Sequence, residues 1–192
     1  MHPRCITYII PTTMKLLDYV NAYQACLSGA DCDELIAKFE ACEYKEKLDI
    51  AKTPKFTQVN INETYPELVQ NLVRATLSAY ELYRADHPET QFLPPPRTLE
   101  TFRVKRYRQD TDEQFKTHID VADYTSAKRY LAFLFYLNDD FDGGETEFEY
   151  GQVIHPQRGK VLIFPPTWQF PHAGLPVTMG TKYIMSTYLT FA

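Results

Sequence analysis

The stretch "RYLAFLFYLN", residues 129–138, is almost entirely apolar or aromatic and runs into the turn-forming sequence "DDFDGG". Short segments of this kind, bounded by Gly, Pro and Asp, are typical of β-strands. Four others lie in the second half of the chain: "TFRVKRYR" (101–108), "ETEFEY" (145–150), "GKVLIFPP" (159–166) and "TKYIMSTYLTF" (181–191). Many short strands with no helical pattern between them predict a β-sandwich or jelly roll.

The first half of the chain has a different pattern, which predicts helices. We expect one helix through "MKLLDYVNAYQACL" (14–27), capped by Thr12 or Thr13 and ended by Gly29. A second should follow a cap at Asp31 or Asp33. The segment "KFTQVNI" (55–61) predicts a short strand.

A third helix is expected from the sequence "TYPEL" (64–68) onward. Thr64 and Glu67 have the spacing of a capping box, and Pro66 suits a first helical turn. Apolar residues then recur with a period near 3.6 until the pair His87-Pro88 ends the helix.

Three consecutive prolines in "LPPPR" (93–97) separate the two halves and favour an extended connector. The length of 192 residues suits one domain. We therefore expect a single domain over residues 1–192, in which residues 1–95 are mostly helical support and residues 96–192 form the β core.

Composition excludes several classes of function. With 44% hydrophobic and 14% aromatic residues the chain can fold around a core, and a net charge of −5 gives no reason to expect a nucleic-acid partner. The one basic run, Arg103, Lys105, Arg106 and Arg108, is interpreted as a solvated strand face.

The four cysteines, Cys5, Cys26, Cys32 and Cys42, form no CxxC pair and have no histidine nearby, which argues against zinc and favours reduced thiols. The apolar start of the chain is broken by Pro11, and no apolar run is long enough to span a membrane. These features predict a cytoplasmic protein without a membrane partner.

His118 and Asp120 lie two residues apart in "QFKTHIDVAD" (114–123). On a strand such residues point to the same face and can reach one ion, although a lone H-x-D is a weak signal. Among the other histidines, His172 follows an apolar strand, whereas His87 and His155 precede prolines. Two imidazoles and one carboxylate are the ligand set of non-haem Fe(II) oxygenases, and zinc accepts the same ligands.

Lys182 lies ten residues after His172 in an otherwise apolar and aromatic strand. Alone it would be an ordinary exposed lysine. Beside a metal site it becomes an anchor for a dicarboxylate, because a lysine inside a sheet needs an anionic partner.

Residues 101–191 resemble the 2-oxoglutarate- and Fe(II)-dependent dioxygenases of the prolyl 4-hydroxylase superfamily. Four motifs occur in the family's order: "THID", "YLAFLFYLNDDFDGGETEF", "VIHPQRGKVLIFPP" and "PHAGLPVTMGTKY". The first 95 residues match no motif of the family. The resemblance implies a catalytic domain with a double-stranded β-helix (jelly-roll, cupin-like) core supported by α-helices.

The resemblance also assigns residues. His118, Asp120 and His172 correspond to the iron ligands, and Lys182 to the residue that pairs with the far carboxylate of 2-oxoglutarate. Tyr136 and Tyr107 resemble tyrosines of the 2-oxoglutarate pocket, and Tyr136 could equally be a packed core residue. Phe115 stands where the family often has Tyr.

The implied activity is hydroxylation of a substrate C–H bond with Fe(II), 2-oxoglutarate and O₂, ascorbate being a further expected cofactor. The presence of Asp120 favours hydroxylation over halogenation. The expected substrate is a prolyl residue in a peptide or protein, with release of succinate and CO₂. The alternatives are a hydroxylase of a free amino acid or other small molecule and a catalytically silent metal-binding jelly roll that binds a partner.

Overall fold

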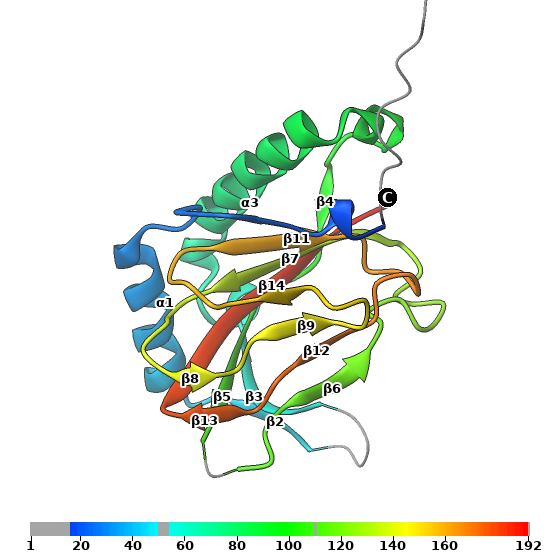
Figure 1. Ribbon diagram of the computed structural model, residues 1–192. Coiled ribbons are helices and arrows are strands. Elements are labelled where there is room, and N and C mark those ends of the chain that lie inside the picture. Colours follow the sequence, from blue (N-terminus) through cyan, green and yellow to red (C-terminus); the bar gives the residue numbers. More distant parts are fainter. Residues whose placement is uncertain (1–15, 50–53, 110, 192) are drawn as a thin grey trace, which may run out of the picture.

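The computed structural model describes residues 16–49, 54–109 and 111–191. Its larger sheet is antiparallel throughout (Figure 1). The strands follow the order β1 (Asn21–Tyr23), β11 (Val161–Phe164), β7 (Arg129–Tyr136), β14 (Thr181–Thr190), β5 (Arg103–Arg108), β3 (Lys55–Asn60) and β2 (Glu46–Asp49), and β4 (Thr98–Leu99) pairs with β14.

A second sheet packs against the first and carries four short strands, in the order β10 (Val153–Ile154), β9 (Thr146–Phe148), β12 (His172–Gly174) and β6 (Phe115–His118). A two-stranded sheet joins β13 (Val177–Met179) to β8 (Asp142–Gly143). The mainly β, jelly-roll architecture with supporting helices is confirmed.

The helices are α1 (Gly29–Ala41), α2 (Ile61–Thr64) and α3 (Pro66–Asp86), with 3₁₀ turns η1 (Leu16–Tyr19) and η2 (Pro88–Phe92). Figure 1 shows α1 and α3 beside the large sheet, on the side away from β9, β12 and β6. The large sheet is therefore the middle layer of the molecule.

Strand alternation divides the core into two clusters, one on each face of the large sheet. Phe133 and Phe135 of β7 belong to the cluster that packs under the helices. Ala132 and Tyr136 of the same strand belong to the cluster between the two sheets. Both clusters contain fully buried aromatic rings, among them Phe133 and Phe135 in the first and Tyr136 and Phe148 in the second.

The helix expected over 14–27 is wrong in its described part. Residues 16–19 form only a 3₁₀ turn, and Asn21–Tyr23 form β1, which pairs with β11. Leu27 N–H donates to the Gly159 carbonyl. Local helix propensity is a weak preference, and here the backbone hydrogen bonds formed by pairing with the edge of the large sheet outweigh it.

Two expected helix caps are also wrong. Ser28 caps α1 in a capping box with Asp31, so Gly29 begins this helix and does not end the preceding one. At α3 the cap position is Tyr65 without a side-chain hydrogen bond, and the Thr64 hydroxyl donates to the Asn60 carbonyl.

The third helix otherwise runs as expected, from Pro66 to Asp86, and β3 forms where a strand was expected. Strands of the first half pair with strands of the second: β1 with β11, and β3 with β5. Among the described residues, none of the helices is long and apolar enough to cross a membrane. Thr12, Thr13 and Cys5 lie outside the described residues, and Cys26, Cys32 and Cys42 are free thiols.

Candidate metal centre and its pocket

His118 and His172 are brought together by the small sheet. Strands β6 and β12 pair antiparallel, and the two histidines are Cα partners in their register. Their ring centroids are 4.3 Å apart. Two histidines that are more than fifty residues apart in sequence thus lie side by side on neighbouring strands.

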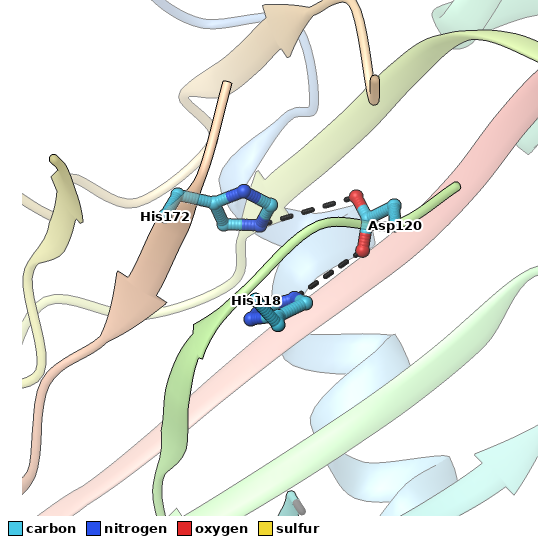
Figure 2. Close-up of side chains that lie close together, drawn as sticks. All are labelled: His118, Asp120 and His172. Carbon is cyan, nitrogen blue, oxygen red and sulfur yellow. Dashed lines mark ion pairs between the residues drawn. The ribbon is translucent and has the colours of Figure 1, made fainter. Parts of the chain in front are cut away.

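Asp120 completes the cluster from beyond the end of β6 (Figure 2). Its Oδ1 lies 3.3 Å from His118 Nε2, and its Oδ2 lies 3.9 Å from His172 Nε2. One potential ligand atom from each residue lies within 4.8 Å of the others. Because β6 ends at His118, Asp120 reaches the site from the segment that follows the strand. The expectation that His118 and Asp120 share one face of a single strand is therefore wrong.

Hydrogen bonds to the backbone place a proton on Nδ1 of both imidazoles. His118 Nδ1 lies 2.9 Å from the Lys116 carbonyl oxygen, and His172 Nδ1 lies 3.1 Å from that of Phe170. A carbonyl oxygen only accepts, so both Nδ1 atoms donate. Each Nε2 therefore points toward the Asp120 carboxylate, and in the neutral imidazole this atom carries the lone pair that can bind a metal.

The electrostatics of the cluster favour an ionised Asp120 and an uncharged His172. Burial lowers the pKa of His172, and the Asp120 carboxylate only partly opposes this. For Asp120, burial disfavours the charge, but the hydrogen bond with His118 and the charge interactions with both imidazoles bring its pKa down to about 2. Asp120 is therefore ionised, and a metal ion bound to the two Nε2 atoms would take the place of the imidazole protons that face this carboxylate.

Lys182 lies in the same pocket as the three candidate ligands. The residue is 2% exposed, and its Nζ donates to the Gly144 carbonyl. The ammonium lies 5.5 Å from the ring centroid of Tyr107 and 5.8 Å from that of Tyr136. Burial lowers its pKa to about 8, with the charge of Glu145 opposing the shift. Among the described residues it has no carboxylate in ion-pair contact, so an anionic ligand would stabilise it.

Tyr107 and Tyr136 are placed differently. Tyr107 lines the pocket and is the Cα partner of Lys182 in the β5–β14 ladder. Tyr136 is fully buried and does not line the pocket. Its hydroxyl lies 2.7 Å from Thr146 Oγ1, and Thr146 does line it. The structure thus places Thr146, which the sequence did not single out, between Tyr136 and the pocket.

Phe115 also lines the pocket and stacks on His118, with ring centroids 3.4 Å apart and planes 6° apart. The histidines set aside in the sequence lie elsewhere. His87 Nε2 is 2.8 Å from Asn21 Oδ1, and the exposed His155 faces Glu145.

The basic run of β5 is not a uniformly solvated face. Arg106 and Arg108 form ion pairs with Glu40 and Glu113, whereas Lys105 lines the pocket beside the candidate metal ligands. Sequence reasoning missed Lys105 because a single strand pattern does not show which face a second sheet covers. The alternation of Lys105 with Tyr107 was the available signal.

Residues 102–190 match the sequence model of the 2OG-Fe(II) oxygenase superfamily. This part of the chain belongs to that superfamily. The match confirms the resemblance found in the motifs, and it covers the strands that carry the cluster of His118, Asp120 and His172. The family name itself implies Fe(II) and 2-oxoglutarate, and the donor set of the cluster fits the metal.

Similar proteins include the procollagen-lysine,2-oxoglutarate 5-dioxygenase of Drosophila melanogaster, 29% identical over 182 residues, an alignment with 85% of this chain. The chain spans only 23% of that relative's length.

Among solved structures, the viral collagen prolyl hydroxylase of Paramecium bursaria Chlorella virus-1, in its 2OG complex, has a TM-score of 0.68 and 22% identity over 88% of this chain and 94% of the viral chain. The prolyl hydroxylase of Trichoplax adhaerens, in complex with a hypoxia inducible factor peptide fragment, has a TM-score of 0.72 and 13% identity over 90% and 84%. These likenesses establish the fold of the 2OG-Fe(II) oxygenases for this chain.

Proposed function

We propose that this protein is a 2-oxoglutarate-dependent hydroxylase, and that its substrate is a prolyl residue in a peptide or protein. The observation that carries the proposal is the shared pocket: three metal-binding side chains at one wall and a buried, unneutralised lysine at another. A metal that binds three protein ligands on one side keeps its other positions open for a co-substrate and O₂.

In this proposal His118, Asp120 and His172 hold Fe(II), and Lys182 binds the far carboxylate of 2-oxoglutarate. When bound, the iron supplies oxidation of 2-oxoglutarate by O₂ to succinate and CO₂, and transfer of one oxygen atom to a substrate C–H bond. The chain positions the reactants and excludes water. The apolar side chains that line the pocket, among them Ala132, Leu134, Phe164 and Ile184, would keep water from the reacting atoms.

Tyr107 and Thr146 would complete the 2-oxoglutarate pocket. Tyr107 adds an aromatic face to the Lys182 ammonium, and the Tyr136 hydroxyl orients the Thr146 hydroxyl. Tyr136 would therefore act on the co-substrate through Thr146. We also propose that the chain works as one catalytic domain, a view supported by the pairing of β1 and β3 with the strands of the second half.

The choice of a prolyl substrate is supported by the names of the two structural neighbours described above, both of which are prolyl hydroxylases. A lysyl substrate is the second candidate, because the fly relative is named for procollagen-lysine. Both candidates are peptidyl residues.

Succinate release is the decisive test. The protein is incubated with Fe(II), 2-oxoglutarate and O₂, with and without ascorbate, and with prolyl peptides, lysyl peptides, free proline or free lysine. We expect succinate together with a peptide product heavier by one oxygen atom. His118→Ala should abolish both, whereas His155→Ala, at a histidine with a side chain 75% exposed, should leave both intact. Turnover that survives His118→Ala contradicts the metal assignment, and products from the free amino acids alone support the small-molecule alternative.

A further inference from the structure

Lys105 is a second lysine in the pocket, and neither the metal nor the 2-oxoglutarate assignment uses it. It lies on β5 and lines the pocket with the candidate metal ligands. Its neighbour Arg106 points to the opposite face, where it pairs with Glu40 at 2.9 Å. The basic residues on the two faces of β5 thus differ, because Arg106 has a counter-ion in Glu40 and Lys105 faces the pocket.

Lys105 lies two ladder positions away from the position of Lys182. Lys182 is the Cα partner of Tyr107, and Lys105 is the Cα partner of Ile184. Two residues along a strand correspond to roughly 7 Å. The Lys105 ammonium lies 5.1 Å from the ring centroid of Phe56, and the residue is partly buried. Lys105 is therefore directed into the pocket but at a different point from Lys182.

Lys105 has no counter-ion of its own. In the part of the chain that the structure describes, its Nζ makes no hydrogen bond and no ion pair. Burial lowers the pKa of Lys105 to about 8, and Asp120 opposes the shift without an ion-pair contact. A group with this pKa is mostly charged at neutral pH. An Asp120 that binds a metal cannot also neutralise Lys105.

The charges of the pocket leave a positive excess. Lys105 and Lys182 contribute two positive charges, and Asp120 contributes one negative charge, while imidazoles that bind a metal through Nε2 carry no charge. A divalent metal and the dianion 2-oxoglutarate cancel each other. One positive charge then remains in the pocket, on a partly buried side chain for which an uncompensated charge is costly.

We infer that Lys105 binds a carboxylate of the substrate, so that the preferred substrate carries an Asp or Glu side chain next to the hydroxylated residue. This inference rests on the proposed function and names the chemistry that selects its substrate. Lys105 is thereby a specificity-determining residue, and its charge complements an acidic peptide rather than a basic one.

The test compares two peptides that are identical except for Glu or Gln before a single proline. The protein is loaded with Mn(II) and 2-oxoglutarate, and calorimetry measures the dissociation constant of each peptide at low salt. We expect the Glu peptide to bind about tenfold more tightly, equivalent to about 1.4 kcal/mol. Lys105→Met should make the two peptides equal, and Lys105→Arg should retain the preference. The exposed Lys128 provides the matched control, since Lys128→Met should keep the preference.

Three results would overturn the inference. The first is equal affinity of wild-type protein for the two peptides, including the case in which neither binds. The second is a Glu preference that persists in both Lys105→Met and Lys105→Gln with folding verified by circular dichroism. The third is a Lys105→Met protein that loses 2-oxoglutarate affinity while keeping the preference, which would assign Lys105 to the co-substrate. Because binding is measured without turnover, absence of succinate in the separate activity assay would contradict the proposed function alone.

Discussion

The Arg129 guanidinium holds the main chain of Asp120: its Nη1 donates to the Asp120 carbonyl at 2.9 Å. Its Nε and Nη2 donate to the two carboxylate oxygens of Glu100, each at 2.9 Å. The guanidinium also lies 4.0 Å above the ring of Tyr188. Asp120 lies past the end of β6, where ladder hydrogen bonds no longer fix the backbone, and this side-chain clamp takes their place.

Loosening the clamp should weaken metal binding without removing a ligand. Glu100→Gln replaces a bidentate ion pair with a weaker contact, which frees Arg129 and the Asp120 carbonyl. We expect Mn(II) affinity to fall by about 10-fold or more, as for other outer partners of metal ligands. Titration of the metal-free protein measures it. Arg84→Lys is the control, since the Arg84–Glu81 pair lies exposed on α3, and an equal loss there would contradict a specific role for the clamp.

Lys182→Met should stabilise the fold while weakening the binding of 2-oxoglutarate. A buried ammonium with one carbonyl partner is costly, as its pKa lowered to about 8 indicates. We expect its removal to raise the free energy of unfolding of the ligand-free protein by about 1–2 kcal/mol, measured by urea denaturation. In the same variant, 2-oxoglutarate affinity of the Mn(II) form should fall by about 100-fold or more. Unchanged affinity would remove Lys182 from the co-substrate site.

Gly144 is required by both its backbone and its surroundings. Its φ is +68°, and a Cβ at this position would meet Phe141 Cε2 at 2.9 Å and Lys182 Cδ at 3.0 Å. Gly144→Ala should therefore cost about 2 kcal/mol of stability and also reduce 2-oxoglutarate affinity. Gly151→Ala is the matched control, because φ is +92° there and no atom lies within 4 Å of the Cβ. It should lose stability alone, and a similar loss of affinity would refute the contact with Lys182.

The stability of the metal-free protein should depend on His172 in mildly acidic solution. Burial lowers the folded-state pKa of His172 below the unfolded value of 6.5. The unfolded chain therefore binds more protons in this window, so the His172 contribution is complete above about pH 6.5 and is lost as pH falls through the folded pKa. Urea denaturation from about pH 8 to about pH 5 should show a smaller slope for His172→Gln than for wild type. Identical slopes would mean that His172 does not titrate on unfolding.

Much of the fold could be predicted because its strands carry a local pattern. The segment 129–138 appears as β7, and the segments around 101, 159 and 181 appear as β5, β11 and β14. The region around Asn21 was predicted as helix because its local pattern permits one. Pairing with β11 is a contact across more than a hundred residues, and no local pattern reports it.

By itself, the sequence determined which side chains are candidates for the site, because His118, Asp120, His172 and Lys182 lie in motifs with fixed spacing. Only the tertiary structure decided their convergence: the β6–β12 register pairs the histidines, and the Arg129–Glu100 clamp places Asp120. It also decided that Lys105 belongs to the pocket. Spacing along a strand shows whether two residues lie on the same face of the sheet. It does not show which of the two faces a second sheet will cover, because that depends on packing between segments that are distant in sequence.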